Sequence, residues 1–413
     1  MTMNDEEVVG MLRRLDEGPH RPARVDLARA VRDGRRRRRA RRMTGAGSAA
    51  LVVALAALVA VPVLRDAGRS EGTPPAAAPP TGCTVERLPL PAGAGSGDVT
   101  TGDPTGRYLL GSVASPDLSG GWTVLWVDGR LRELPPAARN LTLLDVNTAG
   151  QAIGVGGDRG SVGYFHQLDS GQGASGDGGV VRPLPGGPNT QPVAINEAGR
   201  IAGNRLRVGP DDPNLSVPVV WASSTSTPVE LALPGPDWAG RAEGIADDGT
   251  IVGSVGQGGG FQRGYLWRPD GTGEFLPTPP GAAHFFRPTA RGPWAIGSSL
   301  PENQSPARQQ VARLRLSTGE FAPLPQVAEG FRPLAGNARG WVVGLVGTDR
   351  AGLLTEAGLL ELAPPRIDPA PALLSPMARV LSDDGRTIAG FYQYRSTDGQ
   401  PIRTGEPLRW TCR

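Results

Sequence analysis

A short phrase built around two glycines recurs along this 413-residue chain and constrains its fold more than any other feature. One Gly is followed by three or four residues and then by a second Gly on an apolar run, most plainly at 199–203 and 249–253. The second glycines, spaced 43 to 50 residues apart, are Gly111, Gly154, Gly203, Gly253, Gly297, Gly344 and Gly390. A strand-like repeat of ~40–50 residues is typical of a radial array of small β-sheets. The seven copies therefore predict an all-β fold, a seven-bladed β-propeller.

Each repeat contains four strand-like pieces, which in the third repeat are 192–196, 200–204, 218–221 and 228–234. The first two are joined by a turn that ends in Gly, a strong hairpin signal. The fourth piece often ends in Leu-Pro. The third often ends in Trp, and these residues are Trp126, Trp221, Trp267 and Trp410. Because they recur at one structural position, we interpret them as packing between blades and not as a sugar-binding platform.

These phrases resemble a known family of bacterial extracellular repeats, the HAF type. The resemblance rests on Ile195-Asn-Glu-Ala-Gly-Arg-Ile-Ala-Gly203 and on Gly264-Tyr-Leu-Trp267, and it covers roughly 96–413. The His-Ala-Phe tripeptide that names the family is absent from the chain, and the fifth and sixth repeats are degenerate. The resemblance implies an exported, propeller-like protein and brings no catalytic residues to carry over.

An uncharged apolar segment near the N-terminus predicts one transmembrane α-helix at 43–64. Its length suits a hydrocarbon core of ~30 Å. Seven arginines precede it, at 35–39, 41 and 42, which places the N-terminus in the cytoplasm and the remainder outside. A cleavable signal peptide is the alternative, but its charged region of 42 residues would be far longer than usual.

The predicted domains are a cytoplasmic Arg-rich head (1–42), the transmembrane helix (43–64), a Pro/Ala-rich stalk (65–82) and an extracellular propeller (83–413). The first 46 residues hold 13 Arg against 7 acidic residues, whereas the remainder is slightly acidic. This distribution does not fit a nucleic-acid binder, and it makes the plasma membrane the expected partner of the head. The head and helix resemble those of actinobacterial single-pass membrane proteins, which include anti-sigma factors.

The two cysteines lie at the two ends of the repeat array. The last repeat lacks its fourth strand at the C-terminus, and residues 85–91 have the fourth-strand pattern with no preceding blade. Joining these ends completes one blade and places Cys412 beside Cys83. We therefore expect a disulfide that closes the ring and stabilises it by ~5 kcal/mol in chain-entropy models.

Catalytic patterns are scarce in this sequence. The three His share no metal-ligand spacing, and neither a P-loop nor a Gly-x-Ser-x-Gly motif occurs, so no cofactor, metal or catalytic residue is predicted. The pairs Asp247-Asp248 and Asp383-Asp384 are interpreted as turn residues and not as calcium ligands. Possible ligand contacts are Asp211, Asp212, His284, Arg287 and Arg291, which we place in loops on the face away from the membrane.

The sequence therefore predicts a cell-membrane protein that is not an enzyme. Its extracellular propeller would act as a binding or scaffolding module for a protein or a cell-envelope glycan. Two alternatives remain open at this stage. One is a propeller enzyme acting on cell-envelope glycan, which would need carboxylates converging at the central funnel. The other is a transmembrane regulator of anti-sigma type.

Overall fold

The computed structural model describes residues 78–117, 119–157, 162–168, 179–207, 215–257, 263–301, 309–328, 330–366, 373–395 and 403–413. The chain divides into two compact units, Met1–Gly72 and Thr73–Arg413, and every described residue belongs to the second. The predicted head, the transmembrane segment and most of the stalk lie outside the described residues. Within the described ranges, no helix has the length and apolarity needed to cross a membrane.

The described strands form antiparallel groups of four, each named here by its first strand. Five groups are separate four-stranded sheets, and an eight-stranded sheet consists of two more groups joined by a parallel pairing of Thr190 with Val162. The separate sheets are β2 (Ser96–Gly102), β3 (Tyr108–Ala114), β4 (Gly121–Val127) and β5 (Arg130–Arg132); β14 (Trp238–Ile245), β15 (Ile251–Gln257), β16 (Arg263–Trp267) and β17 (Gly273–Phe275); β18 (Ala282–Arg291), β19 (Trp294–Pro301), β20 (Gln310–Arg315) and β21 (Glu320–Phe321); β22 (Phe331–Gly336), β23 (Val342–Val346), β24 (Arg350–Thr355) and β25 (Gly358–Leu362); and β26 (Leu373–Leu381), β27 (Thr387–Arg395) and β28 (Arg403–Cys412) with β1 (Cys83–Arg87).

The eight-stranded sheet holds β6 (Thr142–Val146), β7 (Gln151–Gly156), β8 (Val162–Gln167), β9 (Val181–Pro183), β10 (Thr190–Ile195), β11 (Ile201–Arg207), β12 (Leu215–Trp221) and β13 (Val229–Glu230). One short helix, α3 (Pro136–Arg139), lies between the β2 and β6 groups.

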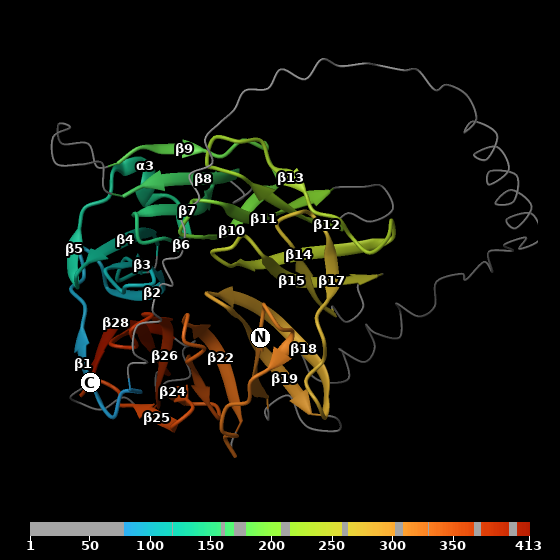
Figure 1. The fold of residues 1–413 in the computed structure, drawn as a ribbon. Helices are drawn as coiled ribbons and strands as arrows, with labels where there is room; N and C mark the ends of the chain where they lie inside the picture. Colours follow the sequence, from blue (N-terminus) through green and yellow to red (C-terminus); the bar gives the residue numbers. More distant parts are fainter. Residues whose placement is uncertain are drawn as a thin grey trace, which may run out of the picture. The chain divides into compact units, whose positions relative to one another are not determined.

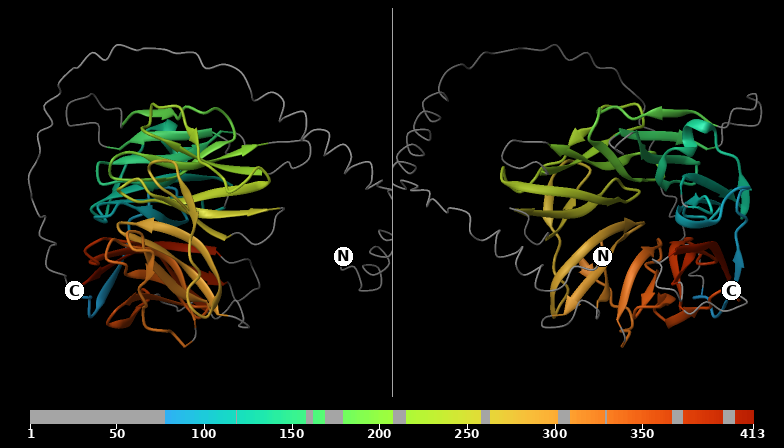
Figure 2. Two further views of the ribbon diagram at one scale, coloured as in Figure 1. Left: turned by 45° about the vertical axis from the view of Figure 1, so that its right-hand side comes forward. Right: turned by 180° about the vertical axis from the view of Figure 1, so that it is seen from behind.

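The groups are arranged radially around a common centre, with their first strands innermost (Figures 1 and 2). Each group packs against the next one in the sequence, and β26, β27 and β28 pack against β2, so the ring is closed. The second strands are sandwiched between neighbouring groups. Strand β23, for example, is buried at every residue. This double burial explains why the repeat phrase is a continuous apolar run and not an alternating one.

The two glycines of the repeat have separate structural reasons. The first glycines lie in the turns between first and second strands and have φ between 51° and 86°, a left-handed conformation that side chains other than Gly disfavour. The second glycines lie opposite a β-bulge in the first strand of their group. At Gly253 a Cβ would lie 1.9 Å from the carbonyl oxygen of Arg241, and at Gly390 it would lie 1.8 Å from that of Met377. The bulged backbone therefore leaves no room for a side chain.

The interpretation of the recurrent tryptophans as packing residues is confirmed. Each is fully buried, and its indole N–H donates to a carbonyl in the segment that leads into the first strand of its own group. These bonds join Trp126 to Pro89 (2.8 Å), Trp221 to Pro185 (2.7 Å), Trp267 to Ala232 (2.7 Å) and Trp410 to Ala363 (2.8 Å). The third strand thus anchors the crossover from the preceding group.

The Leu-Pro pairs differ from the prediction, because each of them lies beyond the end of its fourth strand. Strand β5 ends at Arg132 and β13 ends at Glu230, before the Leu-Pro pairs are reached. Leu134 and Leu184 are buried and belong to hydrophobic clusters between groups. These leucines therefore contribute to the core after the chain has left the fourth strand.

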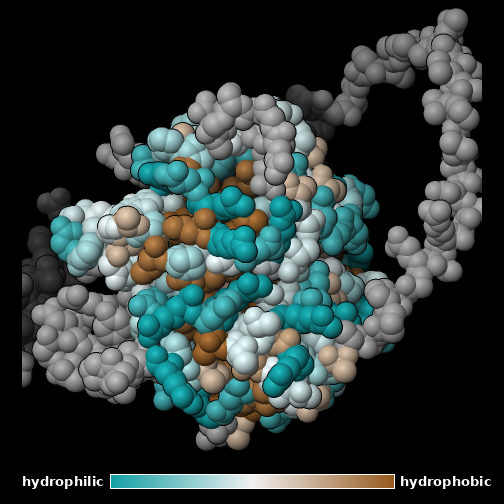
Figure 3. Space-filling view, turned by 90° about the vertical axis from the view of Figure 1, so that its left-hand side faces the viewer, coloured by the Kyte–Doolittle hydropathy of each residue, from teal (hydrophilic) through white to brown (hydrophobic). Residues whose placement is uncertain are grey.

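The predicted closure of the ring by the chain ends is confirmed. Strand β1 pairs antiparallel with β28, with Cys83 opposite Cys412, and these two residues form a disulfide. In Figure 1 the blue β1 runs beside the red β28. Figure 3 views the side of the molecule that carries β1 and β5, where hydrophilic and apolar side chains are interspersed.

Candidate functional site

A polar depression lies at the centre of the ring, at the end where the first strands turn into the second strands. Its cavity is small, about 20 Å³, and it draws residues from five groups. Its lining residues are Pro104, Ile195, Asn196, Glu197, Ile245, Asp247, Arg291, Gly292 and Asp383. We call this depression the channel mouth.

Asparagines hold the turns of the mouth together. Asn196 accepts a hydrogen bond from the backbone N–H of Arg200 in its own turn (2.9 Å) and donates from Nδ2 to the carbonyl of Ala246 in the next group (3.0 Å). Asn147 and Asn337 make the equivalent bonds to the carbonyls of Asn196 and Ser382, each at 3.0 Å. These side chains satisfy buried turn groups on both sides of a group boundary. The mouth is thereby fixed by the scaffold.

Acidic side chains follow these positions and are also held by neighbouring turns. Glu197 accepts hydrogen bonds from the N–H and the hydroxyl of Thr148, and its own N–H donates to Asp247 (3.3 Å). Asp383 accepts from the N–H of Ala338 (2.8 Å). Each of these carboxylates is therefore positioned by a bond that crosses from one group to the next.

Arg291 is the cation of the channel mouth. It is the last residue of β18, where other groups carry the bridging Asn, and its guanidinium lies 3.6 Å from the Asp145 carboxylate of the β6 group. The β10 and β14 groups lie between these two groups in the ring, so the ion pair spans the mouth. Asp145 also accepts from the N–H of Ile195 at 2.9 Å. The pair thus ties together strands of three groups.

Burial shapes the ionisation of the mouth. It raises the pKa of Asp145 above its ordinary value, and the Arg291 charge only partly opposes this. It also raises the pKa of Glu197, with smaller contributions from the charges of Asp247 and Asp103, and it raises the pKa of Asp383. Desolvated carboxylates that approach each other in this way favour binding of a proton or another positive group.

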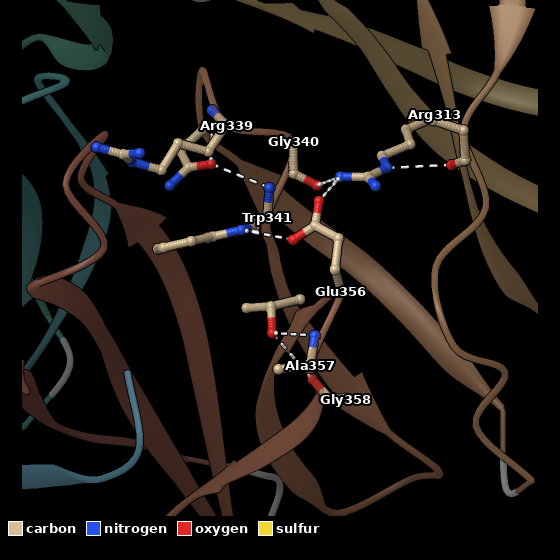
Figure 4. A network of polar contacts seen from close by, with 10 residues as sticks. Arg313, Arg339, Gly340, Trp341, Glu356, Ala357 and Gly358 are labelled. Atoms are coloured by element: carbon tan, nitrogen blue, oxygen red, sulfur yellow. Dashed lines mark hydrogen bonds and ion pairs between the residues drawn. The ribbon is translucent and has the colours of Figure 1, made fainter. Parts of the chain in front are cut away.

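A second polar network joins the β18 and β22 groups (Figure 4). The buried Arg313 donates to the carbonyl of Gly340 (3.0 Å) and to Glu356 (2.7 Å), and Trp341 donates to the same carboxylate (2.9 Å). Although burial opposes ionisation of Glu356, its hydrogen bond with Arg313 holds the pKa of Glu356 below the ordinary value. This network links two groups at a boundary where Arg291 occupies the position that holds the bridging Asn in the β6, β10 and β22 groups.

Of the residues predicted as ligand contacts, His284, Arg287 and Arg291 lie in the described part of the chain. Asp211 and Asp212 lie outside the described residues. His284 and Arg287 are strand positions of β18 and not loop residues as predicted, and Arg291 ends the same strand at the opposite face from the one predicted. The bulge between Phe286 and Thr289 explains the error, because it accommodates Pro288 inside a strand that the sequence presents as a loop.

The role assigned to the Asp pairs is confirmed and extended. Asp248 accepts from the N–H of Thr250 (2.8 Å) and Asp384 from that of Arg386 (2.9 Å), so both cap their own turns. The preceding residues, Asp247 and Asp383, face the channel mouth instead. Across the parts of the chain that the structure describes, no cluster of three His, Cys, Asp or Glu has a metal-binding arrangement.

Sequence reasoning did not single out Asp145, Glu197 or Asp383 as residues near the centre of the ring. Glu197 and Asp383 could be recognised by their position, since each follows the buried turn residue of its repeat. Aligning the turns with one another would have placed both of these residues at the channel axis. Asp145 lies after the bulge of β6, and nothing in the repeat phrase marks that place.

The chain matches no protein-family model and no curated protein. Among solved structures it resembles the β-propeller domain of the Trilobed protease from Pyrococcus furiosus, at 10% identity and a TM-score of 0.52 over 76% of this chain and 95% of that one. It also resembles a puromycin hydrolase, at 18% identity and a TM-score of 0.50 over 75% of this chain and 53% of that one. Virginiamycin B lyase from Staphylococcus aureus aligns at 13% identity and a TM-score of 0.47, over 80% of this chain and 99% of that one. The chain therefore has an all-β, propeller-like fold.

Proposed function

We propose that this protein is a membrane-anchored extracellular β-propeller that acts as a binding or scaffolding module for a protein or cell-envelope ligand. The observation that carries the proposal is the channel mouth, where four groups of the ring contribute polar side chains held by bonds between groups. Such a prepositioned concave surface binds a partner without losing conformational entropy of its own.

The ring has seven blades in this proposal. Five separate four-stranded sheets and the two halves of the eight-stranded sheet correspond one to one with the seven repeats. The proposal also places the repeats in the HAF-type extracellular family, on the resemblance of the Ile-Asn phrase that begins at 195–196.

The anchor in this proposal is the apolar segment 43–64, with residues 1–42 in the cytoplasm and the propeller outside the cell. The charge pattern of the sequence supports this topology. The disulfide is consistent with it, because disulfides persist in oxidising compartments outside the cytoplasm.

The proposal is tested by proximity labelling on live cells, with a labelling enzyme fused to the C-terminus of the full chain. The test variant replaces Glu197, Asp247 and Asp383 with the corresponding amides. The control replaces the surface residue Glu133 with Gln, since that side chain is 91% exposed and remote from the mouth. We expect a defined set of envelope proteins or glycans labelled by the wild type and the control, and lost in the triple variant. Identical labelling by all three proteins would contradict a binding role for the channel mouth.

A second candidate is an enzyme that acts on cell-envelope glycan. The convergence of Glu197, Asp247 and Asp383 at the channel mouth favours it, because glycoside hydrolysis uses paired carboxylates with one raised pKa. The test is release of reducing ends from purified cell wall by the full chain and by Glu197→Gln. Release that is lost in the variant would replace the binding proposal with this one.

A further inference from the structure

The disulfide occupies an unusual place among the fourth strands of the ring. In the β2 group, Trp126 of β4 faces Leu131 of β5, and the residues Asp128-Gly129 form the turn between these strands. In the β26 group, Trp410 of β28 faces Val85 of β1, and Cys412 and Cys83 occupy the turn position. The disulfide therefore stands where another group has a peptide connection.

Apart from the disulfide, strand β1 is held to its sheet by a single ladder at the sheet edge and by a few side-chain contacts. It pairs with β28 alone, over five residues, and three of its side chains are exposed. Its side-chain contacts include an ion pair of Arg87 with Glu406 (2.7 Å), a looser one of Glu86 with Arg409 (3.7 Å), and hydrogen bonds from Thr84 to Thr411 (3.4 Å) and from Arg87 to the carbonyl of Arg366 (3.2 Å). Exposed pairs of this kind contribute little to stability. The partly buried Val85 also packs against the core of the β26 group.

The segment that follows β1 is held much more firmly. Leu88 is buried in a cluster with residues of β2, β3 and β4, and the carbonyl of Pro89 accepts the indole N–H of Trp126 at 2.8 Å. Opening of the seam would therefore stop at Leu88. The free part would be 78–87, and the edge of β28 would lose its only strand partner on that side.

We propose that the Cys83–Cys412 disulfide is a redox-sensitive latch: its reduction releases β1 alone and exposes the β28 edge, while the rest of the ring stays folded. The co-reactant is a dithiol. One of its thiolates attacks Sγ of Cys83, which is only partly buried, and Cys412 leaves as a thiolate. The second thiolate of the dithiol then displaces Cys83, so two electrons pass to the protein and the dithiol becomes a disulfide.

Release of β1 has two physical consequences. In the oxidised protein the disulfide joins the residues after the predicted stalk to β28, the last strand of the ring. After reduction, the first firm attachment of the chain to the ring is at Leu88. The unpaired N–H and C=O groups of β28 also become available to another strand, as on any open sheet edge. The latch does not depend on the identity of the ligand or on the membrane topology proposed above.

Hydrogen exchange of the full chain in detergent, with and without dithiothreitol, tests the latch. Reduction should accelerate exchange in 83–87 by at least about 100-fold, while 238–257 of the β14 group changes by less than about threefold. Unchanged exchange in 83–87, or failure of the dithiol to reduce the folded protein, overturns the proposal. Accelerated exchange in both regions overturns it as well, because the disulfide would then stabilise the whole ring.

Two variants separate the bond from the cysteines themselves. Replacement of both cysteines with Ser should reproduce the reduced state. Adding Thr84→Cys and Thr411→Cys to that variant places a new pair one position along the same ladder, where these residues face each other. The new pair should restore slow exchange in 83–87 under oxidising conditions. If it forms and exchange stays fast, the covalent link is not what holds β1. If the double Ser variant does not fold, the dithiol experiment on the wild type decides alone.

Discussion

Replacement of Gly253 with Ala tests the packing rule that underlies every repeat. The added Cβ would lie 1.9 Å from the carbonyl oxygen of Arg241 and 3.0 Å from Cα of Ala242, and both are backbone atoms. The bulged strand β14 must then move away from β15. This loses the adjacent ladder bonds, at about 1 kcal/mol each, and adds overpacking strain of about 1–3 kcal/mol. We expect the free energy of unfolding to fall by at least about 3 kcal/mol.

Two further glycines calibrate this effect. Gly120→Ala is the matched control, because a Cβ there meets nothing within 4 Å and the backbone is not left-handed. We expect it to change stability by no more than about 1 kcal/mol. Gly249→Ala introduces a side chain at φ +86°, which should cost about 1–2 kcal/mol.

The assay is thermal unfolding of the full chain, followed by tryptophan fluorescence in one detergent. At about 2 °C per kcal/mol for a domain of this size, Gly253→Ala should melt roughly 6 °C or more below the wild type. Gly249→Ala should fall between it and the control. If Gly253→Ala melts within about 2 °C of Gly120→Ala, the bulge does not explain the second glycine of the repeat.

Three further predictions concern a buried carboxylate, a buried arginine and a tryptophan hydrogen bond. Because burial raises the pKa of Asp383, the folded chain holds that proton more tightly than the unfolded chain. The stability from this residue is fully present below the ordinary value of 3.8 and is lost as the pH rises above it, so Asp383→Asn should flatten the fall in melting temperature over that rise. Arg313→Met should lower the free energy of unfolding by about 2–4 kcal/mol, because it removes the hydrogen bonds to the carbonyls of Gly340 and Ala322. The control Arg350→Met, at an exposed ion pair, should lower it by less than about 1 kcal/mol in the same melting assay. Trp221→Phe should cost about 2 kcal/mol through the lost bond to Pro185, seen as a lower denaturation midpoint with unchanged slope.

The ring and its closure by β1 and β28 could be predicted because both follow from the repeating sequence pattern. The two glycines mark a turn and a bulge in each repeat, and the missing fourth strand of the last repeat defines the place of β1. Where the pattern weakens, the prediction fails. Strand β18 begins before His284 and absorbs Pro288 in a bulge, so its residues read as a loop and Arg291 was placed on the wrong face.

The candidate site was less predictable because it is a property of the closed ring. Asp145 and Arg291 are far apart in sequence, and neither belongs to the repeat phrase. Their contact depends on the radius of the ring and on the bulge that turns each first strand. The individual turns could be predicted from their Asp, Asn and Gly residues, but the meeting of five turns at one mouth required the structure.

The seam between the two ends of the chain is the central claim, and non-reducing peptide mapping tests it most directly. Trypsin cleaves after Arg69, Arg87 and Arg409, so the claim predicts one disulfide-linked species joining residues 70–87 to residues 410–413. This species should separate into its two peptides on reduction. Recovery of Cys83 and Cys412 in alkylated form, from protein alkylated before digestion without reduction, would contradict the disulfide that closes the ring.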